Sequence, residues 1–471
     1  MHEHKANKIG LAYAAGTGER NRVKKFVGRS MELQFLNEYF QREGSQILVV
    51  YGSKGVGKTA LLQEFCRDKK HSYYLARACS EREQRFQWGA ELRAEGRELN
   101  RYPEYAELFE NAAARKETEK QVIVIDEFHH MVKGDGAFFE TLLRYVEGRL
   151  LSRPLLVTLV TSASGWVENT MVGKIGRSAA AIHGWMKVRE MPLAELAVLF
   201  PGYSREDCIC NYAVLGGIPG YWMNFSQESS AVENIIRNVL CQESRLYEEM
   251  SLYLLEELRE PAVYHSILAA MARDCNKLND IYKHTGFSRA KISVYLKNLM
   301  ELDLVEKVSS YETGSRAETQ KGIYRISNFY VKFYFRYLFP GMSSLRQLTP
   351  AAFYEQRIAP SFALYVEEAY RKICREQVGR SCHNAGEWLG KSGAIDVIAA
   401  NAEGGLTVAA CSYAKQMTGE DYEWLLFCMK KAKVKSNDIR MYCEKGFDES
   451  LQRIAAQGKV KLLTVPLGEG R

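Results

Sequence analysis

An eight-residue stretch early in the chain has residue types and spacing that could bind phosphate. With the alanine after it, the stretch reads Gly52, Ser53, Lys54, Gly55, Val56, Gly57, Lys58, Thr59 and Ala60. Glycines let backbone N–H groups converge on phosphate oxygens, and the positive end of a following helix adds to the attraction. Lys58 is expected to reach the β- and γ-phosphates and Thr59 to bind Mg²⁺. The stretch therefore predicts a site for ATP and Mg²⁺. A chance glycine-rich turn is disfavoured by the apolar run before it and the amphipathic stretch after it.

Two adjacent carboxylates follow about 70 residues later, at the end of the apolar run Val122–Ile125. Asp126 is placed to hold Mg²⁺, directly or through water, and Glu127 to act as the general base on the attacking water. An apolar run ending in two acids is a weak signal alone, but it gains weight behind a phosphate-binding loop. The pair therefore indicates hydrolysis of ATP. We expect His129 and His130 to line the pocket rather than bind a metal, because no partner at ligand spacing accompanies them.

Polar residues also end the next apolar run, where they could orient the attacking water. Thr161 or Ser162 could fill this role, and we assign it to Ser162, although both residue types are common at strand ends. Arg144, Arg149 and Arg189 are candidates for a contact with the γ-phosphate. The simpler interpretation of each arginine is a solvated charge.

The elements that position these residues follow an alternating pattern between residues 26 and 204. Short apolar runs alternate with amphipathic stretches, which is typical of a parallel sheet covered by helices. The runs are nearly continuous, as expected for strands buried on both faces. The expected strands are Ile47–Tyr51, Tyr73–Ala78, Val122–Ile125, Leu155–Val160 and Val188–Met191. Residues 205–260 then have a helical pattern that Gly216–Gly220 interrupts, because three glycines and a proline cannot continue a helix.

Residues 261–340 change pattern again. Three short helical stretches are followed by two strand-like pieces, which is the order of a winged helix. The stretches are Tyr264–Ala272, Leu278–Thr285, Ser288–Met300, Leu304–Val308 and Ile323–Ile326. The segment holds 12 Lys and Arg against 7 Asp and Glu, and its third helix carries Arg289, Lys291 and Lys297. These three residues are candidates for contact with DNA phosphates. The alternative is a winged helix that only packs against other protein parts.

Composition limits the remaining classes of protein. The 471 residues are 46% hydrophobic and 26% charged, which is ordinary for a globular protein of several domains. A net charge of +7 permits contact with nucleic acid but does not by itself indicate it. The 11 cysteines are scattered without a Cys-x-x-Cys pair, as in proteins of a reducing compartment. No apolar run approaches the ~18–20 residues of a membrane span. We expect a cytoplasmic protein without a membrane partner.

Together these motifs resemble the archaeal ATPase group of AAA+/STAND proteins. The resemblance is carried by the loop, by Asp126 and Glu127, and by Phe26–Leu33, Leu215–Tyr221 and Glu256–Tyr264. It implies an α/β chain: a P-loop parallel sheet of the AAA+/ASCE type, a helical lid, a winged helix and a restriction-endonuclease-like α/β domain at the carboxyl end. The corresponding ranges are 1–25 for an amino-terminal tail, 26–204 for the ATPase domain, 205–260 for the lid, 261–340 for the winged helix and 341–471 for the nuclease-like domain. Gly184 and Trp185 stand where the group often has an arginine, so the source of any arginine finger is left open.

The nuclease-like domain lacks part of the pattern that nuclease activity needs. The active fold uses an upstream acid, an Asp and an acid-x-Lys pair to hold Mg²⁺ at the scissile phosphate. Glu367 or Glu368 could be the first acid, and Asp396 matches the second. Where the acid-x-Lys pair is needed, the sequence reads Ala410-Cys411-Ser412. We therefore expect a nuclease-like fold without nuclease chemistry.

Three hypotheses about function follow. The preferred one is an ATP-binding protein that hydrolyses ATP slowly with Mg²⁺ and acts as a nucleotide switch on an unknown protein partner. The second is a DNA-binding regulator in which the nucleotide is structural. The third is an ATP-regulated nuclease.

Overall fold

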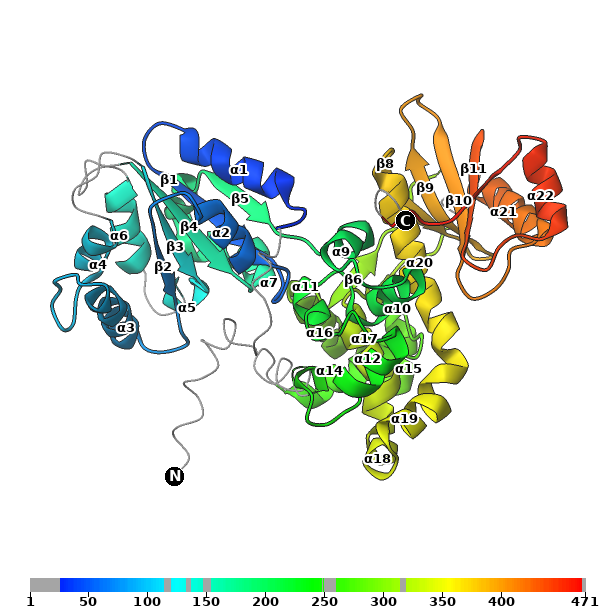
Figure 1. Ribbon diagram of the computed structural model, residues 1–471, viewed down its shortest axis with the longest axis horizontal. Helices are drawn as coiled ribbons and strands as arrows, with labels where there is room; N and C mark the ends of the chain where they lie inside the picture. The colour runs from blue at the N-terminus through cyan, green and yellow to red at the C-terminus, as the bar shows by residue number, and fades with distance from the viewer. Residues whose placement is uncertain are drawn as a thin grey trace.

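The computed structural model describes residues 26–113, 120–132, 137–146, 154–247, 249, 260–313 and 319–467. One sheet lies on one side of the molecule and a second on the other, with a largely helical part between them (Figure 1). Among the described helices, none combines the length and apolar character that crossing a membrane requires.

The first sheet is the predicted parallel P-loop sheet. Its strand order is β2-β3-β4-β1-β5, and every neighbouring pair is parallel. The strands are β1 (Gln46–Tyr51), β2 (His71–Leu75), β3 (Gln121–Asp126), β4 (Leu155–Thr161) and β5 (Gly184–Lys187). β3 and β4 are buried along their whole length, which explains their nearly continuous apolar runs. Because β1, β3 and β4 are neighbours, the residues that follow their carboxyl ends come together at one edge.

Two of the expected strands were misplaced. The strand expected at Tyr73–Ala78 is His71–Leu75, an edge strand whose partly exposed residues include polar ones. The strand expected at Val188–Met191 was wrong, because β5 ends at Lys187. Val188 and Met191 are apolar since both are buried in the core that the sheet shares with the helical part. Burial against helices explains most of that apolar run, and Val188 alone continues the pairing, with its N–H donating to the carbonyl oxygen of Tyr51 at 2.7 Å.

Helices cover both faces of this sheet. Side chains of β1 point alternately to the two faces, so Leu48 and Val50 join one core while Ile47 and Val49 join the other. The first face is covered by helices that include α1 (Ser30–Gln41) and α2 (Lys58–Cys66), and the second by helices that include α3 (Glu81–Ala94), α4 (Tyr105–Ala112) and α6 (Ala137–Val146). Three shorter helices are α5 (His129–Val132), α7 (Ser164–Trp166) and α8 (Val172–Ile175).

The middle part begins with helices that the glycine–proline segment interrupts as predicted. They are α9 (Leu193–Leu199), α10 (Arg205–Leu215), α11 (Pro219–Trp222) and α12 (Ala231–Asn238). Three helices and an antiparallel strand pair follow: α14 (Pro261–Met271), α15 (Leu278–Thr285), α16 (Arg289–Glu301), β6 (Val305–Val308) and β7 (Ile323–Ile326). These bounds agree closely with the stretches expected from the sequence. The assignment of the unit as a winged helix stays a prediction.

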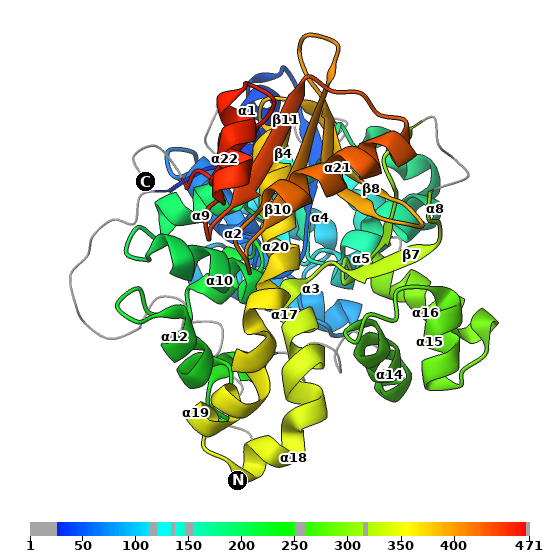
Figure 2. The ribbon, with the colours of Figure 1, turned by 90° about the vertical axis from the view of Figure 1, so that its right-hand side faces the viewer.

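Aromatic helices connect the middle part to the second sheet. They are α17 (Phe329–Phe333), α18 (Phe339–Gln347), α19 (Pro350–Phe353) and α20 (Ala359–Gly379). The expected domain boundary after residue 340 falls inside α18. Figure 2 shows α20 running from the middle part up to the second sheet. Its 21 residues pack against both α10 and that sheet.

The second sheet has five strands in the order β12-β11-β10-β9-β8. They are β8 (His383–Leu389), β9 (Ala394–Ala400), β10 (Leu406–Ser412), β11 (Asp438–Cys443) and β12 (Lys461–Leu463). β8, β9 and β10 are antiparallel neighbours, whereas β10, β11 and β12 are parallel. α20 covers one face, and α21 (Gly419–Ala432) and α22 (Glu449–Ala456) cover the other. A separate α/β unit therefore ends the chain.

Candidate functional site

The backbone of the predicted phosphate-binding loop requires its glycines. The loop joins β1 to α2, and Gly55 and Gly57 have φ angles of 83° and 99°. These values lie in the left-handed region, where glycine is the least strained residue. A β-carbon at Gly52 would overlap the carbonyl oxygen of Val188. Gly55 and Gly57 are thus required by their backbone conformation, and Gly52 is required because a side chain would not fit there.

Lys58 lies at the base of the loop. It is only 7% exposed, and its Nζ donates hydrogen bonds to the carbonyl oxygens of Gly52 at 2.7 Å and Ser53 at 3.2 Å. Burial lowers the pKa of Lys58, and the charges of Glu127 and Asp126 oppose that change. A buried ammonium group beside two carboxylates can exchange its carbonyl partners for phosphate oxygens.

Thr59 and Asp126 meet although they come from different elements. The Thr59 hydroxyl donates to Asp126 Oδ2 at 3.3 Å, and the Tyr73 hydroxyl donates to the same oxygen at 2.6 Å. A hydroxyl and a carboxylate are the hard oxygen ligands that Mg²⁺ prefers, with water and phosphate oxygens completing its shell. No group of three or more His, Cys, Asp and Glu gathers elsewhere among the described residues to hold a metal ion. The two predicted ligands therefore fit Mg²⁺ bound mainly through substrate and water.

Glu127 has an unusual backbone and a carboxylate whose Oε2 accepts several hydrogen bonds. Its φ of 50° is left-handed, which is strained for a glutamate. Its Oε2 accepts hydrogen bonds from Ser162 N at 2.9 Å and Ser162 Oγ at 3.0 Å. His129 Nδ1 lies 3.3 Å from the same oxygen. Burial raises the pKa of Glu127, but bonds from His129 and Ser162 and the charge of Lys58 outweigh it and lower the pKa to about 2.

His129 and Thr161 extend this polar group. His129 is buried, and its Nδ1 lies 2.8 Å from the Thr161 hydroxyl. The structure thus brings Glu127 and Ser162 together with His129, which was expected to line the pocket, and Thr161, the alternative to Ser162 for orienting the attacking water. Tyr73 was missed by the sequence reasoning. The only available signal was a hydroxyl-bearing residue within an expected buried strand.

Arg29 is a further residue whose role the sequence did not reveal. Its guanidinium Nη2 donates to the carbonyl oxygens of Val56 at 2.9 Å and Arg189 at 2.6 Å. It therefore ties the phosphate-binding loop to the chain after β5. Among the predicted arginines, Arg144 and Arg189 have exposed side chains, and Arg149 lies outside the described residues.

The glycine–proline segment between α10 and α11 rests directly on the phosphate-binding loop. The backbone N–H of Gly220 donates to the carbonyl oxygen of Gly55 at 3.0 Å. A β-carbon at Gly55 would lie 2.9 Å from Ile218 Cγ2. On the other side, Met191 N donates to the carbonyl oxygen of Gly217 at 2.7 Å. A change in the loop can therefore reach the helices of the middle part through backbone contacts.

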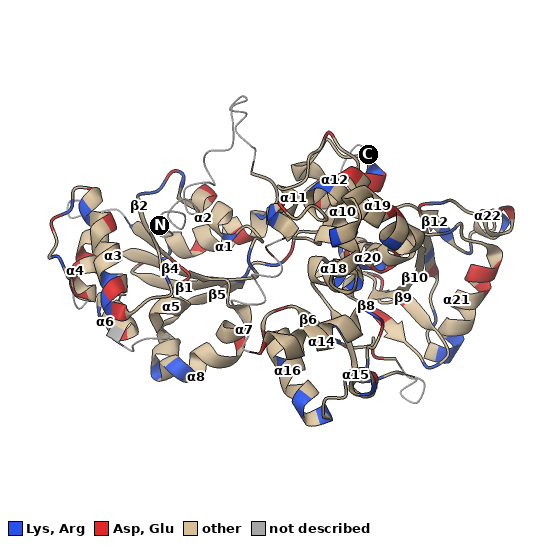
Figure 3. Cartoon of the chain, turned by 90° about the horizontal axis from the view of Figure 1, so that it is seen from below, with Lys and Arg blue, Asp and Glu red and all other residues tan. Residues whose placement is uncertain are grey.

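A second contact joins the site to α16. Ser162 is followed by α7, and a β-carbon at Gly165 in α7 would overlap the carbonyl oxygen of Glu301, the last residue of α16. Figure 3 shows α7 beside the end of α16. Lys187 of β5 adds ion pairs to Glu168 at 3.1 Å and Asp303 at 2.9 Å. The end of α16 is thus held against the residues that follow Ser162.

The predicted DNA-contacting residues lie along α16. Arg289 and Lys297 are exposed, and Lys291 is half-buried. The Arg289 guanidinium lies 4.4 Å from the ring centre of Tyr282, and Lys297 is 3.9 Å from Glu301. The start of this basic face lies at the opposite end of α16 from the contact with α7.

The acids predicted for a nuclease-like site in the carboxyl-terminal unit are engaged by protein groups. Glu367 Oε2 accepts hydrogen bonds from Tyr413 N at 2.9 Å and Ala414 N at 3.0 Å, and Asp396 Oδ2 accepts one from Cys411 N at 2.9 Å. Arg371 lies between the two acids, with Nε 3.1 Å from Asp396 and Nη2 3.5 Å from Glu367. Glu368 instead pairs with Lys332 and Arg325. An arginine therefore supplies positive charge where a metal ion would be needed.

Residues 26–225 match a family model described as an ATPase domain predominantly from Archaea. The uncharacterized protein MJECL04 of Methanocaldococcus jannaschii is 26% identical over 406 residues, which cover 80% of this chain and 84% of that protein. The Walker-type ATPase PABY2304 of Pyrococcus abyssi is 17% identical with a TM-score of 0.49, covering 68% of this chain and 99% of that one. The Aeropyrum pernix ORC2 protein in its ADPNP–ADP complexes is 14% identical with a TM-score of 0.45, covering 70% and 99%.

Proposed function

We propose, from the premise that residues 26–225 are an archaeal-type ATPase domain, that this protein is a Mg²⁺-dependent ATPase acting as a nucleotide switch. The observation that carries the proposal is the chain of contacts from Glu127 through Ser162 and α7 to the end of α16. A site built only to hold nucleotide would not need a carboxylate in this position. We place the switch in the cytoplasm, where its free cysteines stay reduced.

Each residue of the site has a role in this proposal. The loop N–H groups and Lys58 bind the phosphates, and Thr59 and Asp126 hold Mg²⁺. Mg²⁺, when bound, neutralises charge on the phosphate oxygens. Glu127 takes a proton from the attacking water. Ser162 and His129 position Glu127 rather than contact the phosphate themselves.

The contacts of Glu127 support slow hydrolysis. A carboxylate with a pKa of about 2 is a weak base, because the donors that stabilise its charge reduce its affinity for a proton. Ser162 must therefore release Glu127 before proton transfer is efficient. Since α7 follows Ser162 and contacts α16, the position of α16 governs this release. The switch would report the nucleotide state to a protein partner through the middle part of the chain.

Phosphate release by Glu127→Gln is the direct test. We expect Mg²⁺-dependent release by the wild type and a loss of about 100-fold or more in the variant, with binding of a fluorescent ATP analogue preserved. Glu38→Gln, at an exposed position on α1, is the matched control and should behave as the wild type. No phosphate release by the wild type, or equal release by Glu127→Gln and Glu38→Gln, would contradict the proposed hydrolysis.

Contact of α16 with duplex DNA is a second candidate function. The exposed basic residues Arg289 and Lys297, with the half-buried Lys291, favour it. Phosphate neutralisation predicts that affinity falls steeply as salt rises. A mobility-shift titration at several salt concentrations measures that slope, and a flat response removes this candidate.

Nuclease activity is the least supported candidate. Arg371 and backbone N–H groups already occupy oxygens of Glu367 and Asp396. We expect no Mg²⁺-dependent cleavage of DNA by the wild type. Cleavage that Asp396→Ala abolishes would reverse this conclusion.

A further inference from the structure

Helix α21 exposes two large aromatic side chains on its outer face. Trp424 is 54% exposed and Phe427 is 40% exposed. Their rings stack with centres 5.3 Å apart and an angle of 24° between the planes. The helix is anchored by other residues, including Tyr422, Leu425 and Cys428, which are buried in the core beneath the second sheet. The aromatic pair is therefore not required to hold α21 in place.

Lysines follow the aromatic pair along the chain. Lys430, Lys431, Lys433 and Lys435 are all exposed, and no Asp or Glu interrupts them. Lys431 Nζ lies 5.6 Å from the ring centre of Phe427, so the charges begin beside the rings. Figure 3 shows acidic residues in the first part of α21 and basic residues at its other end. We call Trp424, Phe427 and the four lysines the α21 surface.

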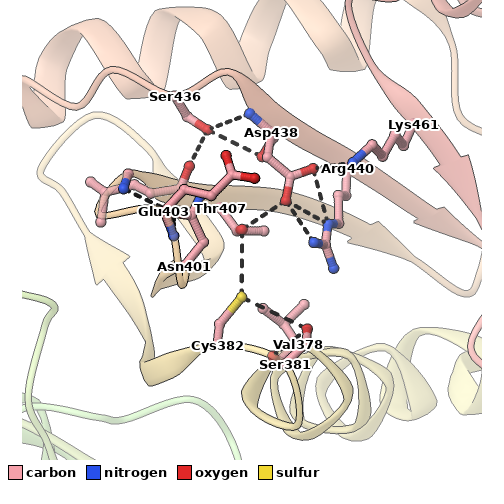
Figure 4. Close-up of polar contacts among 12 residues, drawn as sticks. Val378, Ser381, Cys382, Asn401, Glu403, Thr407, Ser436, Asp438, Arg440 and Lys461 are labelled. Atoms are coloured by element: carbon pink, nitrogen blue, oxygen red, sulfur yellow. Dashed lines mark hydrogen bonds and ion pairs between the residues drawn. The ribbon is translucent and has the colours of Figure 1, made fainter.

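Further cations lie near the starts of β11 and β12, on the face of the second sheet that α20 covers, opposite α21. Asp438, at the start of β11, accepts hydrogen bonds from Arg440 Nη2 at 2.6 Å and Lys461 Nζ at 2.9 Å (Figure 4). Burial raises the pKa of Asp438, but these cations and Thr407 outweigh it and lower the pKa well below its usual range. One carboxylate thus pairs with two cations, so this group of three residues carries an excess of positive charge. These cations therefore lie outside the α21 surface, because the sheet separates them from α21.

We propose that the α21 surface binds single-stranded nucleic acid. Unpaired bases can stack on Trp424 and Phe427, while the phosphates that join them contact the lysines. In a duplex the base faces are covered by their neighbours, so a duplex would leave the rings without partners. A protein partner fits less well, because lysine is depleted in protein–protein interfaces. The proposal does not depend on ATP hydrolysis, and the surface lies on a different domain from α16.

Titration of the full-length protein with a fluorescein-labelled 20-mer of deoxythymidine tests the proposal. We expect anisotropy to report binding at low salt, with affinity falling as salt rises. Stacking of a base on Trp424 should also quench tryptophan fluorescence. The double variant Trp424→Ala/Phe427→Ala should bind at least tenfold more weakly. Lys430→Glu/Lys433→Glu should weaken binding and reduce the salt dependence.

Three control variants test whether binding belongs to the α21 surface. Trp424→Phe keeps a ring at that position, so we expect binding within about threefold of the wild type without the Trp424 quench. Leu364→Ala removes another exposed apolar side chain, on α20, and should change nothing. Arg289→Ala/Lys297→Ala removes the charges of α16 and should leave this affinity unchanged. Equal thermal melting of the variants shows that they are folded.

Several results would overturn the proposal. The first is that the oligonucleotide does not bind to the wild type at low salt. The second is that Trp424→Ala/Phe427→Ala binds as tightly as the wild type. The third is that only the α16 variant, Arg289→Ala/Lys297→Ala, loses affinity. Binding to phosphatidylserine–phosphatidylcholine vesicles in place of the oligonucleotide, with the same dependence on Trp424 and the lysines, would instead assign the α21 surface to a membrane.

Discussion

Gly165 in α7 lies so close to the end of α16 that a β-carbon there would overlap the carbonyl oxygen of Glu301. Ser162, three residues earlier, donates two hydrogen bonds to the carboxylate of Glu127. Three residues span at most about 11 Å, so a displacement of α7 cannot be absorbed far from Ser162. One short segment, from Ser162 to Gly165, therefore contacts both the proposed general base and the helix proposed to contact DNA.

Gly165→Ala should raise the basal rate of ATP hydrolysis about three- to tenfold. The added methyl group pushes α7 away from α16, and the shift weakens the hold of Ser162 on Glu127. Gly173→Ala is the matched control, because a β-carbon at Gly173 meets nothing within 4 Å. Steady-state phosphate release measures both rates, and thermal melting checks that both variants are folded. A folded Gly165→Ala protein with the control's rate would show that this contact does not govern Glu127.

Lys58→Ala should weaken ATP binding about 10- to 100-fold. Each charge-assisted hydrogen bond to a phosphate contributes about 1.5–3 kcal/mol, and Lys58 is the buried ammonium group of the loop. Lys54→Ala removes an exposed lysine from the same loop and should change affinity by less than about threefold. Titration with a fluorescent ATP analogue gives both dissociation constants. Equal affinities in the two variants would remove Lys58 from the site.

The stability that Glu127 contributes should depend on pH in a definite direction. Its pKa in the folded protein is about 2, below the ordinary value of 4.5. A lowered pKa stabilises the folded state above about pH 4.5, and that stabilisation is lost as pH falls toward 2. The difference in melting temperature between wild type and Glu127→Gln should therefore stay constant from pH 7 to 5.5 and shrink below about pH 4.5. A difference that grows on acidification would contradict the arrangement of donors around Glu127.

The phosphate-binding loop and its two acids could be predicted because their signals are local. Glycine spacing, Lys58 and Thr59 lie within one turn, and Asp126 ends an apolar run that any buried parallel strand would show. Arg29 could not be predicted, since its partner Arg189 is 160 residues away and both contacts are to backbone carbonyls. Arg371 had a usable signal that was missed, because it stands four residues after Glu367 on a helix.

The misplaced fifth strand has a similar cause. An apolar run indicates burial but not what covers it, and Val188–Met191 is covered partly by the helical middle part of the chain. Gly184 and Trp185, which have little strand signal, pair with Leu48 and Val49 instead. Tertiary packing therefore determines the position of β5, and the local apolar pattern alone does not reveal it.

Arg205→Ala should loosen the attachment of α10 to the second sheet. Arg205 donates from Nε and Nη2 to the two carboxylate oxygens of Glu444 at 2.6 and 2.8 Å, and the Tyr370 hydroxyl donates to Glu444 at 2.9 Å. Removing Arg205 leaves the largely buried carboxylate without its cation, so we expect a loss of about 2 kcal/mol in stability.

The matched control is Arg453→Ala, which breaks a pair with Glu449 whose side chains are 77% and 86% exposed. Such an exposed pair contributes at most about 0.5 kcal/mol, so this variant should melt within about 1 °C of the wild type. Arg205→Ala/Glu444→Gln should recover part of the loss, because the uncompensated charge is removed as well. Thermal melting followed by circular dichroism compares the four proteins. Equal melting temperatures for Arg205→Ala and Arg453→Ala would show that this ion pair does not fasten α10 to the second sheet.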